Sequence, residues 1–252
     1  MIPIRDENPT VHWPVVTVLF IAGNVAVWGA LQGFGMPVAL VESICHHALI
    51  PAELLGSAEP GTRIPVGRDL GCVLDGEPRP HTLISSMFMH GGWLHLLFNL
   101  WFLWIFGDNV EDVMGPIRFI VFYLLCGIGA AVAQIASAPD SLIPMVGASG
   151  AIGGVMGAYA RLFPRARVHM LVIFGFFVTT VSVPAIFMLG YWFLLQILAG
   201  LPALGSSGGG VAFWAHAGGF LTGLVLSFVF VRNDRLRDRR RRLPRRAQRS
   251  WF

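Results

Sequence analysis

The sequence predicts an all-α polytopic membrane protein, a bundle of six transmembrane helices with a long external first loop. Composition is the first observation: 55% of the 252 residues are apolar, 13% are charged, and the mean hydropathy is +0.66. A soluble domain carries about 25% charged residues, so this chain has the composition of a membrane protein. The second observation is the placement of charge-free stretches, and the third is the placement of the arginines.

Charge-free stretches define the six spans, since a bilayer core requires roughly 20 apolar residues in a helix. Four spans are separate stretches, at 14–33, 81–106, 119–138 and 141–160. A fifth stretch, 168–231, is too long for one span and is divided by Pro184 and a glycine-rich run, which leaves spans at 184–201 and 211–231. The segment 168–183 is short and rich in β-branched residues, so we expect it to lie in the membrane interface or to re-enter the membrane.

The arginines set the orientation, because basic residues near the ends of spans stay on the cytoplasmic side. All 18 basic residues are arginine, and ten of them lie in the last 21 positions. With both termini in the cytoplasm, fifteen arginines are cytoplasmic and three, all in the first external loop, are outside. We therefore predict a membrane domain at 1–231, with its external loop at 34–80, followed by an Arg-rich cytoplasmic tail at 232–252.

The tail carries the basic character of the whole chain, with a net charge of +8 against −4 for the rest. Charge confined to one terminus argues against nucleic-acid binding. We expect the tail to be disordered in isolation and to contact anionic lipid head groups at the cytoplasmic face.

Polar side chains within the spans are the candidate functional residues, because burying them in lipid costs free energy unless they are partnered. Five of them are predicted to lie in the outer half of the membrane: His90, His95, Asn99, Ser149 and His216. His95 and Asn99 are four residues apart, so they share one helix face and can direct two donors to one point.

Ser149 lies at a predicted helix start, between Gly147 and Gly150. Backbone N–H groups at such a start can bind developing negative charge, as an oxyanion hole requires. Small residues recur at four-residue intervals after Ser149 and along the last span, so the two helices can pack closely. Such packing would place the His216 imidazole beside the Ser149 hydroxyl.

Every Asp and Glu falls outside the predicted spans, so no carboxylate is available to orient the histidine. We therefore expect a Ser-His dyad in which a neutral His216 accepts the proton of Ser149 as a general base. A plainer alternative fits each residue singly: an intramembrane serine or asparagine commonly joins helices, His90 can be structural, and regularly spaced glycines are ordinary packing. That alternative explains less well why a glycine-framed serine, a histidine at matching depth and two further donors occur together.

Three blocks of the sequence resemble the rhomboid family of intramembrane serine proteases, in its bacterial form. They are HGGWLHLLFNLWFLWIFGDNVEDVMGPIRFIVFYLLCGIGAAVAQ at 90–134, GASGAIGGVMGAYARLFPRARV, and AHAGGFLTG. The resemblance implies that Ser149 is the nucleophile and His216 the base, and that His95, Asn99 and the Ser149 N–H bind the oxyanion. It also implies structural roles for Gly157, Gly219, Glu111 and Arg79.

Two positions depart from the family pattern. Some members have a Trp-Arg pair in the first loop where this chain has Pro78-Arg79. Some members stack a tyrosine on the catalytic histidine where this chain has Gly153. His216 therefore requires another support, which the sequence does not identify.

The resemblance implies an intramembrane serine endopeptidase of a prokaryotic cell membrane, with its active site toward the outer leaflet and transmembrane proteins as substrates. Membrane lipids are expected partners, and neither a metal nor an organic cofactor is implied. Substrates with helix-weakening residues are expected to be favoured, because a helix must unwind before its carbonyl reaches a serine. Two alternatives remain: a non-proteolytic rhomboid-like protein that binds membrane proteins, and a transporter, for which the predicted spans lack an ion-binding charge.

Two of the three cysteines, Cys45 and Cys72, are expected in the external loop, and Cys126 is expected within the third span. Unpaired thiols remain the simpler expectation, because the sequence does not supply the Cα separation that a bridge requires. Any disulfide is expected to join Cys45 to Cys72, bracing the loop and leaving Cys126 free.

Overall fold

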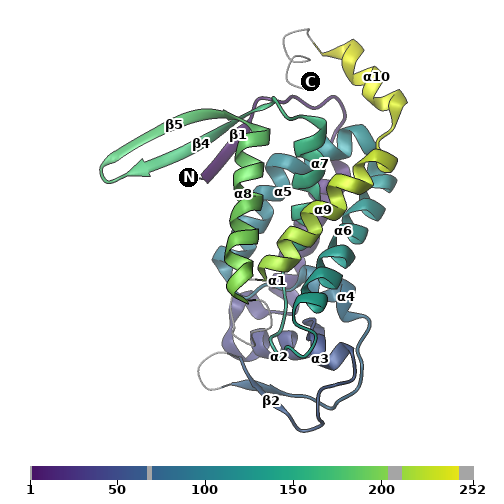
Figure 1. Ribbon diagram of the computed structural model, residues 1–252, viewed down its shortest axis with the longest axis vertical. Helices are drawn as coiled ribbons and strands as arrows, with labels where there is room; N and C mark the ends of the chain where they lie inside the picture. The colour runs from purple at the N-terminus through teal and green to yellow at the C-terminus, as the bar shows by residue number, and fades with distance from the viewer. Residues whose placement is uncertain (1, 67–69, 204–211, 244–252) are drawn as a thin grey trace.

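The computed structural model describes residues 2–66, 70–203 and 212–243, and these form a bundle of six long helices with a small layer at each end (Figure 1). The long helices are α1 (Val15–Ala30), α5 (Trp93–Met114), α6 (Pro116–Ser137), α7 (Ser149–Leu162), α8 (Ala185–Gly200) and α9 (Phe213–Phe230). Each overlaps one of the six predicted spans. The bundle has two ends, which we call the loop end and the tail end.

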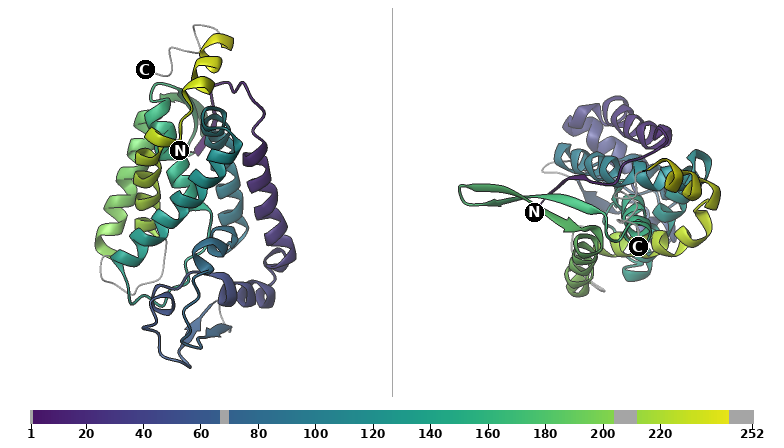
Figure 2. Two further views of the ribbon diagram at one scale, coloured as in Figure 1. Left: turned by 90° about the vertical axis from the view of Figure 1, so that its right-hand side faces the viewer. Right: turned by 90° about the horizontal axis from the view of Figure 1, so that it is seen from above.

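The loop end is formed mainly by the residues predicted as an external loop. It contains η1 (Gly33–Gly35), α2 (Pro37–His47), α3 (Pro51–Leu54), β2 (Arg63–Pro65), β3 (Gly71–Val73), α4 (Thr82–Ser85) and η2 (Ser86–Phe88), while η3 (Leu201–Ala203) follows α8. The tail end contains β1 (Ile2–Asp6), β4 (Arg167–Phe174), β5 (Phe177–Pro184) and α10 (Asn233–Arg242). Figure 2 shows the two layers at opposite ends of the helices.

Length and composition alone mark two of the described helices, α6 and α9, as long and apolar enough to cross a membrane. The helices α1 and α8 are also apolar, but each has 16 residues. The shortest long helix, α7, has 14 residues and lies inside the bundle, since every residue from Ala151 to Ala160 is buried. The fold therefore surrounds the short central helix α7 with longer helices whose outer faces are apolar.

The structure corrects the predicted second span, because α5 begins later and ends later than the charge-free stretch. Asp108, Glu111 and Asp112 lie in its last turns rather than outside a helix. Glu111 is buried and accepts the backbone N–H groups of Val16 and Thr17 at 2.9 and 2.8 Å, which caps the start of α1. A buried carboxylate costs less free energy when it is hydrogen-bonded. A rule that ends each span at the first charged residue therefore placed the end of this helix too early.

The predicted all-α fold is also corrected, since the chain is mostly helical but contains two small sheets. The strands β1, β4 and β5 form an antiparallel sheet in the order β1-β4-β5, and β2 pairs with β3. The segment 168–183 is thus a β-hairpin, whose residues pair with each other and with the N-terminal strand. Its β-branched residues favour strands, and β1 supplies the additional pairing.

A disulfide between Cys45 and Cys72 joins α2 to β3, with the two Cα atoms 5.3 Å apart, and Cys126 is free and buried. The expected pairing is confirmed, and the simpler expectation of unpaired thiols was wrong. The bridge braces a small apolar core of the loop end, formed by Ile50, Ala52, Ala58, Ile64, Cys72 and Leu74.

Part of the Arg-rich tail forms α10, which is attached to the bundle through Arg239. This side chain is fully buried and donates to Asp112 Oδ2 at 2.9 Å and to Asn8 Oδ1 and Asn109 Oδ1 at 2.7 Å each. Its guanidinium also lies 4.7 Å from the centre of the Phe163 ring. The tail thus supplies the cation that Asp112 requires inside the protein. Residues 244–252 lie outside the described residues.

The helices α7 and α9 approach so closely that no side chain fits between them at several glycines, which include Gly157 and Gly219. A Cβ added at Gly157 would lie 2.1 Å from the carbonyl oxygen of Phe220, and one added at Gly219 would lie 2.0 Å from that of Gly150. A Cβ atom essentially never lies within 3.0 Å of a heavy atom outside its own residue and its chain neighbours. The small-residue spacing of the two helices predicted this contact.

The contact predicts a large effect of one methyl group. Gly157→Ala should lower the free energy of unfolding by about 2 kcal/mol or more, because the added Cβ meets backbone that cannot rotate away. The matched control is Gly190→Ala on α8, where a Cβ meets nothing within 4 Å. The control should raise stability by about 0.5–1 kcal/mol through helix propensity. Unfolding of both variants in detergent measures the difference, and equal stabilities would contradict the described packing.

Candidate active site

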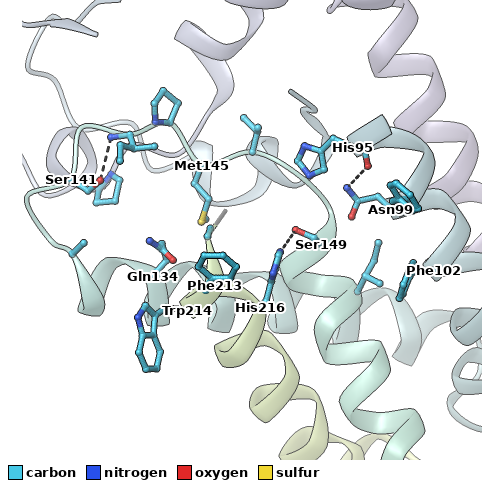
Figure 3. Close-up of a pocket in the computed structure, with 18 of the residues that line it drawn as sticks. His95, Asn99, Phe102, Gln134, Ser141, Met145, Ser149, Phe213, Trp214 and His216 are labelled. Carbon is cyan, nitrogen blue, oxygen red and sulfur yellow. Dashed lines mark hydrogen bonds between the residues drawn. The ribbon is translucent and has the colours of Figure 1, made fainter. Parts of the chain in front are cut away.

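Ser149 and His216 meet where α7 and α9 begin. Ser149 is the first residue of α7, and His216 lies in the first turn of α9. The Nε2 atom of His216 is 2.8 Å from the Oγ atom of Ser149, which is hydrogen-bond distance (Figure 3). The close approach of the two helices brings these short side chains within reach of each other.

The glycines on either side of Ser149 have separate steric reasons to be glycine. Gly147 has a φ of +119°, and a Cβ there would lie 2.6 Å from Nε2 of His95. A Cβ at Gly150 would lie 2.6 Å from the Cβ of Ala130 on α6. The start of α7 is therefore held against α5 on one side and against α6 on the other.

The support that the sequence left unidentified is Gln196, on α8. Its Oε1 atom lies 2.9 Å from Nδ1 of His216, and its Nε2 atom donates to the Trp192 carbonyl at 3.4 Å. Because the amide N–H group is directed to Trp192, Oε1 is the atom that faces the imidazole, and it accepts the Nδ1–H bond. The Nε2 atom of His216 is then free to accept a proton from Ser149.

Trp192 contributes a second contact from the same helix, since its ring centre lies 5.8 Å from that of His216. An aromatic residue of α8 therefore lies beside the imidazole, and its ring reaches Gly153 of α7, where an added Cβ would lie 3.7 Å from Trp192. Sequence reasoning missed Gln196, although it is a polar side chain inside a predicted span and thus met the criterion that selected the other candidates.

His95 and Asn99 line the same cavity as Ser149 and His216, and this cavity has a volume of about 580 Å³. Its walls come from α5, α6, α7, α8, α9 and the segment 141–146, with Pro51 of α3 added from the loop end. The Nδ2 atom of Asn99 donates to the His95 carbonyl at 2.9 Å. An amide nitrogen carries two hydrogens, so one more donor is available at this position.

The remaining predicted residues lie outside the cavity. His90 is buried, and its backbone N–H and C=O groups each bond the Gln32 side chain at 2.8 Å. Arg79 donates to the Cys45 carbonyl at 2.9 Å and to Asp75 at 2.7 Å, which ties the loop end together. Glu111 caps α1 far from the cavity. Within the described ranges, no three His, Cys, Asp or Glu side chains are grouped to hold a metal ion.

The fold and the site define a helical protein of membrane-protein composition in which a serine and a histidine share a hydrogen bond beside a cavity. The sequence model of the Rhomboid domain family matches residues 77–233, which is more than half of this chain. The chain belongs to the rhomboid family, whose members are embedded in membranes.

Known relatives have the same family name. RHOMBOID-like protein 5 of Arabidopsis thaliana is 30% identical over 176 residues, which cover 68% of this chain and 52% of that protein. Rhomboid protein 1, mitochondrial, of Saccharomyces cerevisiae is 28% identical over 177 residues, covering 68% and 47%. Rhomboid protease GluP of Bacillus subtilis is 35% identical over 114 residues, covering 45% and 21%. The chain spans about half or less of the length of these relatives.

Proposed function

We propose that this protein is an intramembrane serine endopeptidase that cleaves other membrane proteins in or near their transmembrane segments. The observation that carries the proposal is the 2.8 Å contact between Ser149 Oγ and His216 Nε2 beside an open cavity. The family includes intramembrane serine proteases, and several relatives of this chain are named proteases or putative proteases. No cofactor takes part in the proposed reaction.

In the proposed reaction, Ser149 Oγ attacks a substrate carbonyl while its proton passes to His216 Nε2. The imidazole then carries a positive charge, and its Nδ1–H remains bonded to Oε1 of Gln196. The same proton is later given to the leaving amine, and water hydrolyses the acyl group on Ser149. Gln196 is a positioning residue in this scheme, since it holds the histidine in the orientation and tautomer that the transfer requires.

The oxyanion of the tetrahedral intermediate is proposed to bind between α5 and the start of α7. The donors are the backbone N–H of Ser149, the side-chain amide of Asn99 and the imidazole of His95. The first N–H groups of a helix have no partner within that helix, and the positive end of the helix dipole favours an anion. Fixed donors of this kind stabilise the transition state more than the ground state.

The six long helices are proposed to be six spans, with both termini in the cytoplasm. The membrane domain is then 1–231, the external loop 34–80 and the cytoplasmic tail 232–252, in the inner membrane of a prokaryote. The arginine distribution supports this orientation. Ser149 and His216 lie at the ends of α7 and α9 nearer the loop end, so the site faces the outer leaflet.

Substrates are proposed to be helical membrane proteins that unwind locally. The carbonyls of an intact helix are hydrogen-bonded along its axis, so a scissile carbonyl must leave its helix to reach Ser149. Segments with glycine, proline or other weak helix formers near the outer face unwind at the lowest cost. Such segments should be cleaved in preference to uniformly apolar helices.

A fluorophosphonate probe tests the proposed nucleophile directly, because only an activated serine reacts with it at an appreciable rate. The purified protein in detergent should be labelled at Ser149, and both Ser149→Ala and His216→Ala should remain unlabelled. Ser141→Ala is the matched control, since Ser141 lines the same cavity and has an Oγ atom that accepts the N–H of Ile143. Undiminished labelling of Ser149→Ala would exclude the assignment, and an unlabelled native protein would favour a binding protein or a transporter.

The role of Gln196 predicts a selective loss of rate. Gln196→Leu keeps the size of the side chain but removes the acceptor for Nδ1–H, so kcat should fall about 10- to 100-fold, the effect of losing a hydrogen bond to a charged group. KM should change little. Gln196→Glu restores an acceptor and should recover much of the rate, while Leu194→Ala on the exposed face of α8 should behave like the native enzyme. If Gln196→Leu instead lowered the stability of the protein and did not lower kcat selectively over KM, Gln196 would be a packing residue.

A further inference from the structure

The β4–β5 hairpin is a projection of the tail end that no other described element covers at its tip. It extends sideways past α8, away from the helices (Figures 1 and 2). Its base is packed, because β1 pairs with β4 as far as Leu171 and both Val168 and Met170 are buried. Its tip, residues 173–178, pairs only within the hairpin itself.

The tip is strongly apolar and open. Phe174 and Phe177 are 81% and 79% exposed, and Phe176 between them is fully exposed. Ile173 and Val178 are also exposed on either side. The segment 168–183 contains no formally charged residue. Monomeric proteins in water rarely display contiguous apolar surface of this kind, which marks contact with a membrane or another protein.

The adjoining surface favours lipid as the partner of the tip. The strand β5 continues directly into α8, whose exposed residues include Phe187, Leu194 and Leu198. In a membrane-embedded protein these side chains face the acyl chains, so the tip prolongs an existing lipid-facing surface. Figure 1 shows the hairpin lying across the direction of α8 rather than continuing it outward.

The charges at the base of the hairpin point to the same partner. Arg165 and Arg167, where β4 begins, are exposed, and so is Arg5 on the paired strand β1. Arginines at this level can contact lipid phosphates while an apolar part enters the acyl region. Glu7, directly after β1, is also exposed, but its carboxylate lies 2.7 Å from the imidazole of His169 on β4. The three arginines are therefore the basic groups that remain to contact phosphates.

We propose that the β4–β5 hairpin is a membrane-docking element whose tip, residues 173–178, inserts into the lipid leaflet at the tail end of the bundle. The partner is the acyl region of the bilayer, and the basal arginines remain at the level of the phosphates. The hairpin does this whether or not Ser149 is a nucleophile, because neither its contacts nor its exposure involve the cavity. It therefore gives the protein a lipid contact outside the helical bundle.

Site-directed spin labelling of the full chain tests the proposal in vesicles of phosphatidylcholine and phosphatidylglycerol. The background is Cys126→Ala, which removes the free thiol and leaves the Cys45–Cys72 disulfide. A nitroxide is attached at Phe176→Cys, where the native side chain is fully exposed and little packing is lost. Leu194→Cys on α8 provides the lipid-facing reference, and Glu59→Cys, at an exposed acidic position of the loop end, provides the aqueous reference.

The label at position 176 should be relaxed by oxygen as strongly as the label at position 194. A water-soluble nickel complex should reach it several-fold less than it reaches position 59. Nickel accessibility equal to that at position 59 would overturn the proposal, since the tip would then lie in water. Spin–spin broadening between labels on different copies would also overturn it, because the tip would then pair with a second copy. Phe174→Cys gives an independent reading if the first variant fails to fold.

Discussion

The distance between α7 and α9 is the constraint on which the proposed site depends. At Gly157 and Gly219 a single Cβ would overlap a backbone oxygen of the opposite helix. Apolar surfaces gain little by association in lipid, so close backbone packing has to hold the helices together. This packing fixes the relative depth of the two helix starts, and the hydroxyl of Ser149, on one of the shortest side chains, thereby reaches the imidazole of His216. Larger residues at these contacts would push α7 and α9 apart. Ser149 and His216 would then no longer be within hydrogen-bond distance, although neither side chain had been altered.

The orientation of His216 depends on a third helix. Through Gln196 and Trp192, α8 contacts the imidazole on the side away from Ser149. Since β5 leads directly into α8, the proposed lipid contact of the hairpin and the support of the histidine are on one continuous segment. The glycine contact of α7 and α9 thus sets the distance between Ser149 and His216, while α8 sets the direction in which the imidazole points.

The sequence predicted those features that depend on local patterns. Small residues at helical spacing and the depth of each residue in its span were enough to place Ser149 beside His216. Gln196 also lay in a predicted span, but the rotation of α8 about its own axis decides which helix this side chain faces. That rotation is set by packing against the other helices and cannot be read from the neighbouring sequence. The segment 168–183 was not recognised as a hairpin because part of its pairing comes from β1, far away in the sequence. The end of α5 was misplaced because the carboxylate of Glu111 is buried with partners, which a charge-based rule does not anticipate.

The central claim is that Ser149 and His216 cleave a peptide bond within the membrane, and a reconstituted cleavage assay tests it most directly. The purified protein is placed in vesicles with a model transmembrane substrate that has glycine and proline near its outer face, and the product ends are identified by mass spectrometry. The account predicts one or a few defined cuts in that part of the substrate, which are absent with Ser149→Ala and with His216→Ala. Cleavage that persists in the Ser149→Ala protein, or a native protein that cuts no helix-weakened substrate, would contradict it.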